Sequence, residues 1–216
     1  MGKYQLDDKG RAQVARYHEK HSTGGGDKKA RLARLREQFL HKQGKEPLVL
    51  RRPTLADEKE VIAMLAEFER EGSAMDGGLF QKDLSYADWL EANTLAEQGL
   101  NLPAGYVPAI QYVSFDTTGK ALGFLHLRLR LSEQLREEGG HIGYSIRPSQ
   151  RRKGYAKRQL RAGLKEAASK QLDRVLVTCD SDNEGSRRTI LSCGGRLEDC
   201  RNGVERYWIT TQGGSR

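Results

Sequence analysis

A basic run between Arg147 and Lys157 is the part of the sequence best suited to bind a phosphate group. It reads Arg-Pro-Ser-Gln-Arg-Arg-Lys-Gly-Tyr-Ala-Lys. Pro148 ends the apolar, strand-like segment before it, because proline cannot donate a hydrogen bond to a β-ladder. An amphipathic helical pattern follows directly. The first N–H groups of a helix lack partners within the helix and carry partial positive charge, so this junction favours phosphate binding.

The side chains of this run strengthen that prediction. Gly154 and the small Ala156 let a pyrophosphate approach the backbone closely, and Arg151, Arg152 and Lys153 supply positive charge. Basic loops that contain one glycine are common, however, so an ordinary solvent-facing loop is the alternative interpretation. The surrounding elements help to decide between the two.

The rest of the sequence predicts the elements that hold this run in place. An apolar, periodic pattern begins near residue 48. Strands are predicted at residues 48–50, 110–115, 121–131, 141–147 and 174–179 and in a final pair around 201–203, and helices at 55–71, 86–98, 154–170 and 185–192. This order predicts an α/β (α+β) fold with a mixed, mostly antiparallel central sheet flanked by helices.

A second segment, Asn183-Glu184-Gly185-Ser186, also lies between a predicted strand and a predicted helix. The two segments, read as R-x-x-G-x-A over 151–156 and N-x-x-S over 183–186, resemble the cofactor-binding signatures of the GNAT acetyltransferase superfamily. The wording His-Ile-Gly-Tyr-Ser-Ile-Arg-Pro and Cys-Gly-Gly-Arg-Leu-Glu is similar to one bacterial branch known only as predicted acetyltransferases. The resemblance covers about residues 48–209.

This resemblance implies an N-acetyltransferase that moves the acetyl group of acetyl-CoA to a primary amine of a small molecule, protein or peptide by direct attack, without a metal. It implies that strand 141–147 splays from strand 174–179, with the cofactor between them. A backbone N–H near Tyr144 or Ser145 would stabilise the oxyanion. The implied cofactor-binding residues are Ser145, Ile146, Arg147, Arg151, Arg152, Lys153, Gly154, Tyr155, Ala156, Lys157, Asn183 and Ser186.

The catalytic acid and base are less clear, because the sequence departs from the family pattern. Many members carry a tyrosine seven residues after the motif asparagine, and here that position is Ile190. Ser192, Tyr207 or water could protonate the thiolate instead. His141 and Tyr144 are the candidate bases on the central strand. The alternative for His141 is that it caps the strand and bonds to the backbone.

Charged residues near the predicted pocket are further candidates with two interpretations. His126, Arg128 and Arg130 share one strand face. If this face lines the acceptor pocket, it favours a carboxylate-bearing amine, and otherwise the arginines are structural. Glu137 and Glu138, just before the central strand, are candidate bases or plain surface charges.

The net charge of +8 lies almost wholly in residues 1–45, which hold 12 lysines and arginines against 5 acidic residues. We expect a basic helical N-terminal arm at 1–45 and the acyltransferase domain at 46–216. The arm favours an anionic partner such as nucleic acid or ribosome, or else acts as a solvated arm or dimer clasp. Two other functions therefore stay open: an acyl-CoA-binding module with little turnover, and a toxin-like acetyltransferase acting on aminoacyl-tRNA.

Three cysteines without metal-binding spacing indicate reduced thiols. No apolar stretch approaches the roughly 20 residues of a membrane span, and the first residues lack the apolar run of a secretory signal. We therefore expect a cytoplasmic protein without membrane contact. A homodimer is a further possibility that the resemblance raises.

Overall fold

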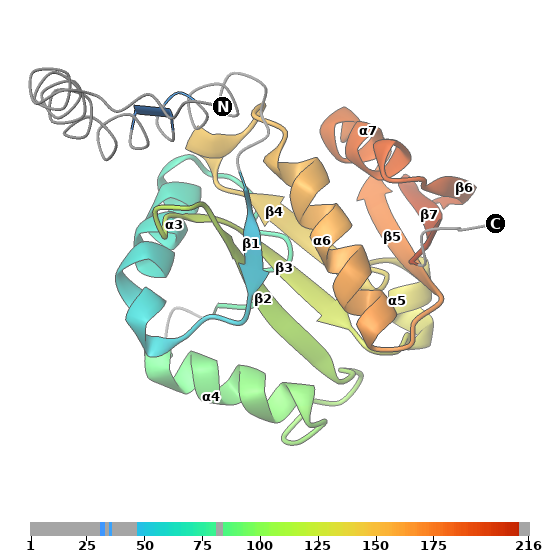
Figure 1. Ribbon diagram of the computed structural model, residues 1–216. Coiled ribbons are helices and arrows are strands. Elements are labelled where there is room, and N and C mark those ends of the chain that lie inside the picture. The colour runs from blue at the N-terminus through green and yellow to red at the C-terminus, as the bar shows by residue number, and fades with distance from the viewer. Residues whose placement is uncertain (1–30, 33–34, 36–46, 81–83, 212–216) are drawn as a thin grey trace, which may run out of the picture. The chain divides into compact units, whose positions relative to one another are not determined.

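The chain divides between Glu46 and Pro47 into two units, and the fold described here is that of the second unit. The computed structural model describes residues 31–32, 35, 47–80 and 84–211 (Figure 1). The predicted arm, residues 1–45, lies outside the described residues apart from three helical positions. Its predicted partner therefore stays a prediction.

In the part of the chain that the structure describes, seven strands form two antiparallel sheets (Figure 1). The first sheet has the order β1-β2-β3-β4 and the second the order β5-β7-β6. In chain order the strands are β1 (Val49–Arg51), β2 (Ala109–Phe115), β3 (Ala121–Arg128), β4 (Ile142–Ile146), β5 (Arg174–Asp180), β6 (Arg196–Arg201) and β7 (Val204–Thr210). Strands β2 and β3 are buried along almost their whole length, which makes them the centre of the domain.

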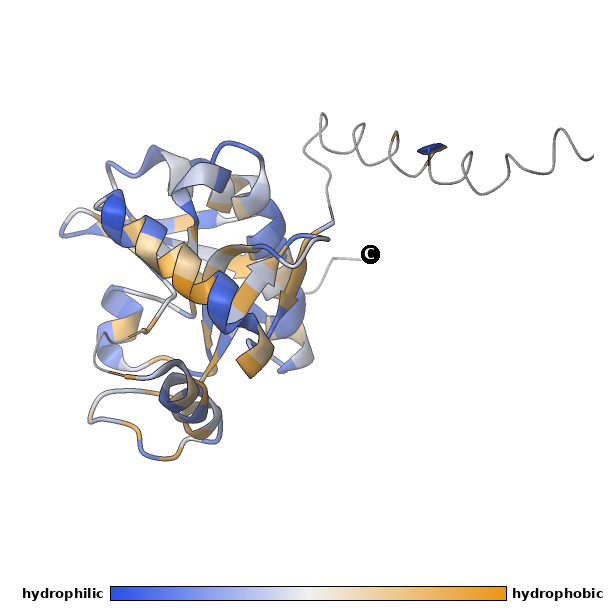
Figure 2. Ribbon diagram, turned by 90° about the vertical axis from the view of Figure 1, so that its left-hand side faces the viewer, coloured by the Kyte–Doolittle hydropathy of each residue, from blue (hydrophilic) through white to orange (hydrophobic). Residues whose placement is uncertain are grey.

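Helices cover both faces of the first sheet. On one face, α3 (Glu58–Arg70), preceded by the 3-10 turn η1 (Leu55–Asp57), and α4 (Tyr86–Glu97) pack their apolar residues around Phe124 of β3. On the other face, α6 (Tyr155–Ser169) packs Leu160 and Leu164 against Leu125 and Leu127. Hydrophilic and hydrophobic residues are mixed along the helices (Figure 2), and α3 and α6 separate them onto two faces, as amphipathic helices do. The predicted mixed α/β fold is confirmed.

The two sheets meet where β4 begins. The backbone N–H of His141 donates to the Leu176 carbonyl at 2.7 Å, and the Leu176 N–H donates to Nδ1 of His141 at 2.9 Å. Gly140 allows this approach, because a Cβ at that position would lie 2.4 Å from the Leu176 oxygen. Beyond this contact β4 and β5 pair in no common ladder, so the strands can separate on either side of a binding site.

Some boundaries differ from the sequence prediction. Strand β3 ends at Arg128 and not at residue 131, because the Leu129 N–H already bonds to the Pro108 carbonyl outside the sheet. A short helix, α5 (Glu133–Glu137), was not predicted, and Ser132 caps it by accepting from the Leu135 N–H. The last helix is α7 (Glu184–Ser192). Within the described residues, no helix combines the length and apolarity needed to cross a bilayer.

Candidate active site

A cavity of about 500 Å³ lies where β4 ends and α6 begins, and we call it the large cavity. The start of α7 and the segment 73–76 complete its walls. The residues that line it are Ser73, Ala74, Asp76, Tyr144, Ser145, Ile146, Gln150, Arg151, Arg152, Gly154, Tyr155, Ala156, Lys157, Asn183, Gly185, Ser186 and Thr189.

The large cavity contains the start of α6, which is built to receive an anion. The N-cap residue, Gly154, has a φ of 77° and offers no side-chain acceptor to the first N–H groups of the helix. A glycine adopts this left-handed backbone at little cost. Arg152 and Lys157 line the cavity beside it. Positive side chains and helix N–H groups thus face the same space, which favours a phosphate.

Most of the predicted cofactor-binding residues are brought together here, but Arg147 and Lys153 are not among those that line the cavity. The Arg147 guanidinium instead donates to Glu67 of α3, and the Lys153 ammonium donates to Gln150 at 3.1 Å. Arg147 therefore links the end of β4 to α3, and the cofactor contact of the exposed Lys153 stays a prediction. Sequence spacing could not reveal the Glu67 contact, since the two residues are 80 positions apart.

Glu67 fixes α3 to the turn that leads into α6. Its carboxylate accepts from Arg147 and from the Ser149 N–H at 2.6 Å. Burial disfavours the charged form, but these hydrogen bonds overcome that cost and lower the pKa of Glu67 to about 2. The turn is therefore held at its first residues before it reaches the phosphate-binding position.

Arg151 also holds the walls together. Its Nε donates to the Ile146 carbonyl at 2.9 Å, and its Nη2 donates to the Ser73 hydroxyl at 2.5 Å. The arginine of the R-x-x-G-x-A signature thus joins β4, the basic turn and the segment 73–76. The Arg151 side chain therefore helps to position the backbone of the segment 151–156.

A second cavity of about 190 Å³, the small cavity, adjoins the large one. Four residues line both: Asp76, Tyr144, Asn183 and Ser186. The other residues of the small cavity come from β3, the segment after α5, β4, β5 and β7, and are Gly77, Arg128, Glu138, Gly139, Ile142, Gly143, Thr178, Cys179, Asp180 and Val204. The four shared residues therefore mark the junction where two bound molecules would meet.

Tyr144 places a phenol hydroxyl at this junction. Its hydroxyl forms a hydrogen bond of 3.0 Å with the Ser186 hydroxyl at the start of α7. Burial raises the pKa of Tyr144 to about 12, so the phenol stays protonated at neutral pH. The neighbouring Ser145 hydroxyl is buried without a partner in the described structure. The site thus holds one proton donor and one unsatisfied polar group.

Asp76 is the site residue that sequence reasoning missed. It lies in the segment 73–80, which has no regular secondary structure. Desolvation and the nearby charge of Asp180 raise the pKa of Asp76 above its usual range. The next residue, Gly77, has a φ of 75°, and Gln111 donates to its carbonyl at 2.8 Å. The glycine pair at 77–78 was the only sequence signal of such a close backbone approach.

Two predicted catalytic residues lie outside both cavities. Nδ1 of His141 accepts the Leu176 N–H, and burial, with the charges of Arg136 and Arg128, lowers the pKa of His141 to about 4. The Tyr207 hydroxyl donates to Glu205 at 2.7 Å within the second sheet. This geometry supports the backbone-bonding interpretation of His141, and neither side chain lines either cavity.

The other candidate acid positions are also removed from the cavities. Ile190 is fully buried in the core, and the Ser192 hydroxyl donates to the Thr189 carbonyl at 2.8 Å. Neither lines either cavity. Of the predicted catalytic residues, Tyr144, which the sequence suggested as a base, is the one that lines the junction.

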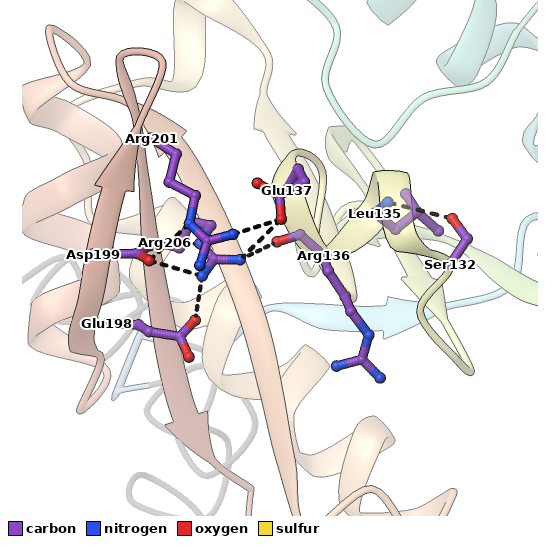
Figure 3. A network of polar contacts seen from close by, with 8 residues as sticks. All are labelled: Ser132, Leu135, Arg136, Glu137, Glu198, Asp199, Arg201 and Arg206. Carbon is purple, nitrogen blue, oxygen red and sulfur yellow. Dashed lines mark hydrogen bonds and ion pairs between the residues drawn. The ribbon is translucent and has the colours of Figure 1, made fainter.

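A buried arginine of β7, Arg206, joins α5 to the second sheet (Figure 3). Arg206 donates to Asp199 of β6 at 2.6 Å and to the Arg136 carbonyl of α5 at 2.6 Å. Arg201 pairs with Glu137 of α5 at 2.6 Å. These contacts join α5 to the second sheet and so position the segment 138–140 that follows α5.

The described residues also show whether acetyl-CoA fits. The large cavity has the volume of a ligand site, offers helix N–H groups and basic side chains for a pyrophosphate, and holds the unsatisfied Ser145 hydroxyl. Among the residues described, no group of three or more histidine, cysteine or acidic side chains is arranged to hold a metal ion. The residues present fit the cofactor that the sequence resemblance implies.

Comparison with known proteins identifies the family. Residues 47–196, well over half of the chain, match the model of the acetyltransferase (GNAT) domain. The chain belongs to the GNAT acetyltransferase family. Members are acetyl-CoA-dependent N-acetyltransferases, and the suspected resemblance is confirmed. No curated protein matches the sequence.

Solved structures share the fold of this GNAT domain. The ribosomal L7/L12 alpha-N-protein acetyltransferase in complex with coenzyme A is 19% identical, with a TM-score of 0.56, over 76% of this chain and 93% of that one. The ribosomal-protein-S5-alanine acetyltransferase from Vibrio fischeri is 16% identical, with a TM-score of 0.56, over 77% and 94%. The Microcin C7 self immunity acetyltransferase, in complex with acetyl-CoA and AMP, is 17% identical, with a TM-score of 0.53, over 76% and 92%.

Proposed function

We propose that this GNAT domain transfers the acetyl group of acetyl-CoA to the primary amine of an acceptor held in the small cavity. The observation that carries the proposal is the junction of the two cavities at Asp76 and Tyr144. The start of α6 and the residues Arg152 and Lys157 would hold the pyrophosphate, and Asn183 and Ser186 the opposite side. When bound, acetyl-CoA supplies a thioester whose carbonyl carbon is open to attack by an amine.

The residues at the junction have complementary roles in that reaction. A bond forms from the amine nitrogen to the carbonyl carbon, and the carbon–sulfur bond breaks. The Asp76 carboxylate orients the amine and accepts the proton that the nitrogen loses as the amide bond forms. The Tyr144 hydroxyl donates a proton to the departing sulfur, which leaves as a thiol. Tyr144 thereby takes the acid role that the buried Ile190 does not fill.

The test is turnover of purified full-length protein. Acetyl-CoA and a panel of primary amines are mixed with the enzyme, free CoA thiol is followed optically, and the acetylated product is identified by mass spectrometry. We expect amine-dependent thiol release with a product heavier by one acetyl group. Tight acetyl-CoA binding without any amine-dependent release would instead support the binding-module alternative.

Location, oligomeric state and a partner for the N-terminal residues are further parts of this proposal. We propose that the enzyme acts in the bacterial cytoplasm, where a reducing environment would suit its three free cysteine thiols. A homodimer and an anionic partner for residues 1–45 rest on the sequence alone. A steep fall of polyanion affinity with salt would support the anionic partner.

A further inference from the structure

The small cavity is lined by charges of both signs. Asp76, Glu138 and Asp180 are its acidic residues, and Arg128 is its one basic residue among the described positions. Asp180 lies near enough to Asp76 to raise the pKa of that group. Arg128 forms no ion pair with a carboxylate in the described structure. An acidic region and an unpaired cation therefore share one small space.

The Arg128 guanidinium is only partly used by the protein. Its Nη1 donates to the carbonyls of Gly139 and Gly140 at 2.8 and 3.0 Å, which fixes the plane of the group. Its Nε and Nη2 have no partner among the described residues. Gly143 leaves room beside Nη2, because even an added Cβ there would lie 3.7 Å away. The edge formed by Nε and Nη2 is the edge that binds a carboxylate with two parallel hydrogen bonds.

The environment of Arg128 makes an unpaired cation costly. Burial lowers the pKa of Arg128, and no carboxylate offsets that effect. A largely buried cation that contacts only carbonyl oxygens is stabilised when a carboxylate binds it directly, and none of the carboxylates of this cavity does so among the described residues. The two carbonyl contacts leave the charge of Arg128 unneutralised, so its free edge favours an anionic group.

This inference rests on the proposed function and names its acceptor class. We propose that the small cavity binds a free amino acid, with its carboxylate on Nε and Nη2 of Arg128 and its amine beside Asp76. The cavity volume of about 190 Å³ equals that of about six water molecules at roughly 30 Å³ each. This space suits a free amino acid. Arg128 is thus a specificity-determining residue, and Asp76 contacts the reacting nitrogen.

Matched amines test the proposal on the unmodified enzyme. Amino acids, their carboxamides and their decarboxylated amines are compared at fixed acetyl-CoA by thiol release. Charge-assisted hydrogen bonds predict kcat/KM for the amino acids about 10- to 100-fold above the carboxamides. Equal rates with carboxamides would overturn the inference in favour of a peptide N-terminus, and faster rates with diamines would overturn it in favour of a polycation. If no amine is acetylated, the proposed function itself fails.

Variants of Arg128 test whether this residue causes the preference for amino acids over their carboxamides. Arg128→Gln should reduce kcat/KM for amino acids about 10- to 100-fold and leave the carboxamides nearly unchanged, while Arg128→Lys should restore part of the loss. Arg130→Gln is the matched control, because Arg130 is exposed and lines neither cavity. Equal losses for amino acids and carboxamides in Arg128→Gln would contradict the assignment. If that variant does not fold, the matched amines on the unmodified enzyme still decide.

Discussion

Gly77 offers a sharp test of how the fold positions Asp76. A Cβ at residue 77 would lie 2.3 Å from the carbonyl oxygen of Gly143 and 2.6 Å from its carbon. These are backbone atoms of β4, so they cannot rotate away as a flexible side chain could. In Gly77→Ala the segment that carries Asp76 must therefore move relative to Tyr144.

The size of that movement sets the expected effect. Carbon–oxygen contacts normally stay beyond about 3.3 Å, so the segment must shift by about 1 Å. A misplacement of about 1 Å at a reacting group costs about 100-fold in rate. We expect kcat to fall about 100-fold, with a smaller rise in KM for acetyl-CoA, because the segment 73–76 lines the large cavity while the start of α6 is not displaced.

Gly119→Ala is the matched control. Gly119 has a φ of 86°, like the 75° of Gly77, but no atom lies within 4 Å of its added Cβ. Both variants therefore carry the strain of a left-handed alanine, about 1 kcal/mol of stability, and only Gly77→Ala carries the clash. Kinetics with the best amine of the panel, beside urea unfolding, separate the two effects. If kcat of Gly77→Ala stays within about threefold of Gly119→Ala, the reasoning about the segment is wrong.

Four further predictions follow from the site. Asp76→Asn should lower kcat about 100-fold, because it removes the carboxylate that accepts the proton. In the unmodified enzyme the rate should fall at acid pH as Asp76 becomes protonated, and this fall should begin at a higher pH than for an ordinary aspartate because the pKa of Asp76 is raised. The variant should lack this fall. Tyr144→Phe should lower kcat about 100-fold with KM for acetyl-CoA nearly unchanged. Gly154→Glu should abolish the rise in Tm caused by acetyl-CoA, whereas Gly194→Glu, also at positive φ with no neighbour within 4 Å of its Cβ, should retain it. The folded pKa of His141, about 4, lies below its unfolded value of roughly 6.5, so Tm should fall as pH drops from 6.5 to 4, and less steeply in His141→Phe.

The geometry of the candidate phosphate site could be predicted because it is local. Strand, turn and helix follow one another within residues 142–169, and Pro148 and Gly154 mark the changes of backbone direction. Sequence order alone therefore places the basic turn at the helix start. The same holds for the second motif, where the Asn183 side chain accepts from the Ser186 N–H as the N-cap of α7.

The acceptor side of the site could not be predicted in this way. Asp76 lies in an irregular segment whose position depends on contacts with Gln111 and Gly143 from two different strands. His141 had two interpretations of nearly equal weight, and only the distance to Leu176 favours one. The alternation of residues along the strand predicted which face Arg128 lies on. It could not predict that no carboxylate of the described residues would pair with the Arg128 guanidinium.

A crystal structure of the enzyme with acetyl-CoA would test the central claim most directly. The account predicts a pyrophosphate within hydrogen-bonding distance of the backbone at 152–157 and a thioester sulfur beside the Tyr144 hydroxyl. A pyrophosphate bound elsewhere, or a sulfur pointing away from the junction of the two cavities, would contradict it.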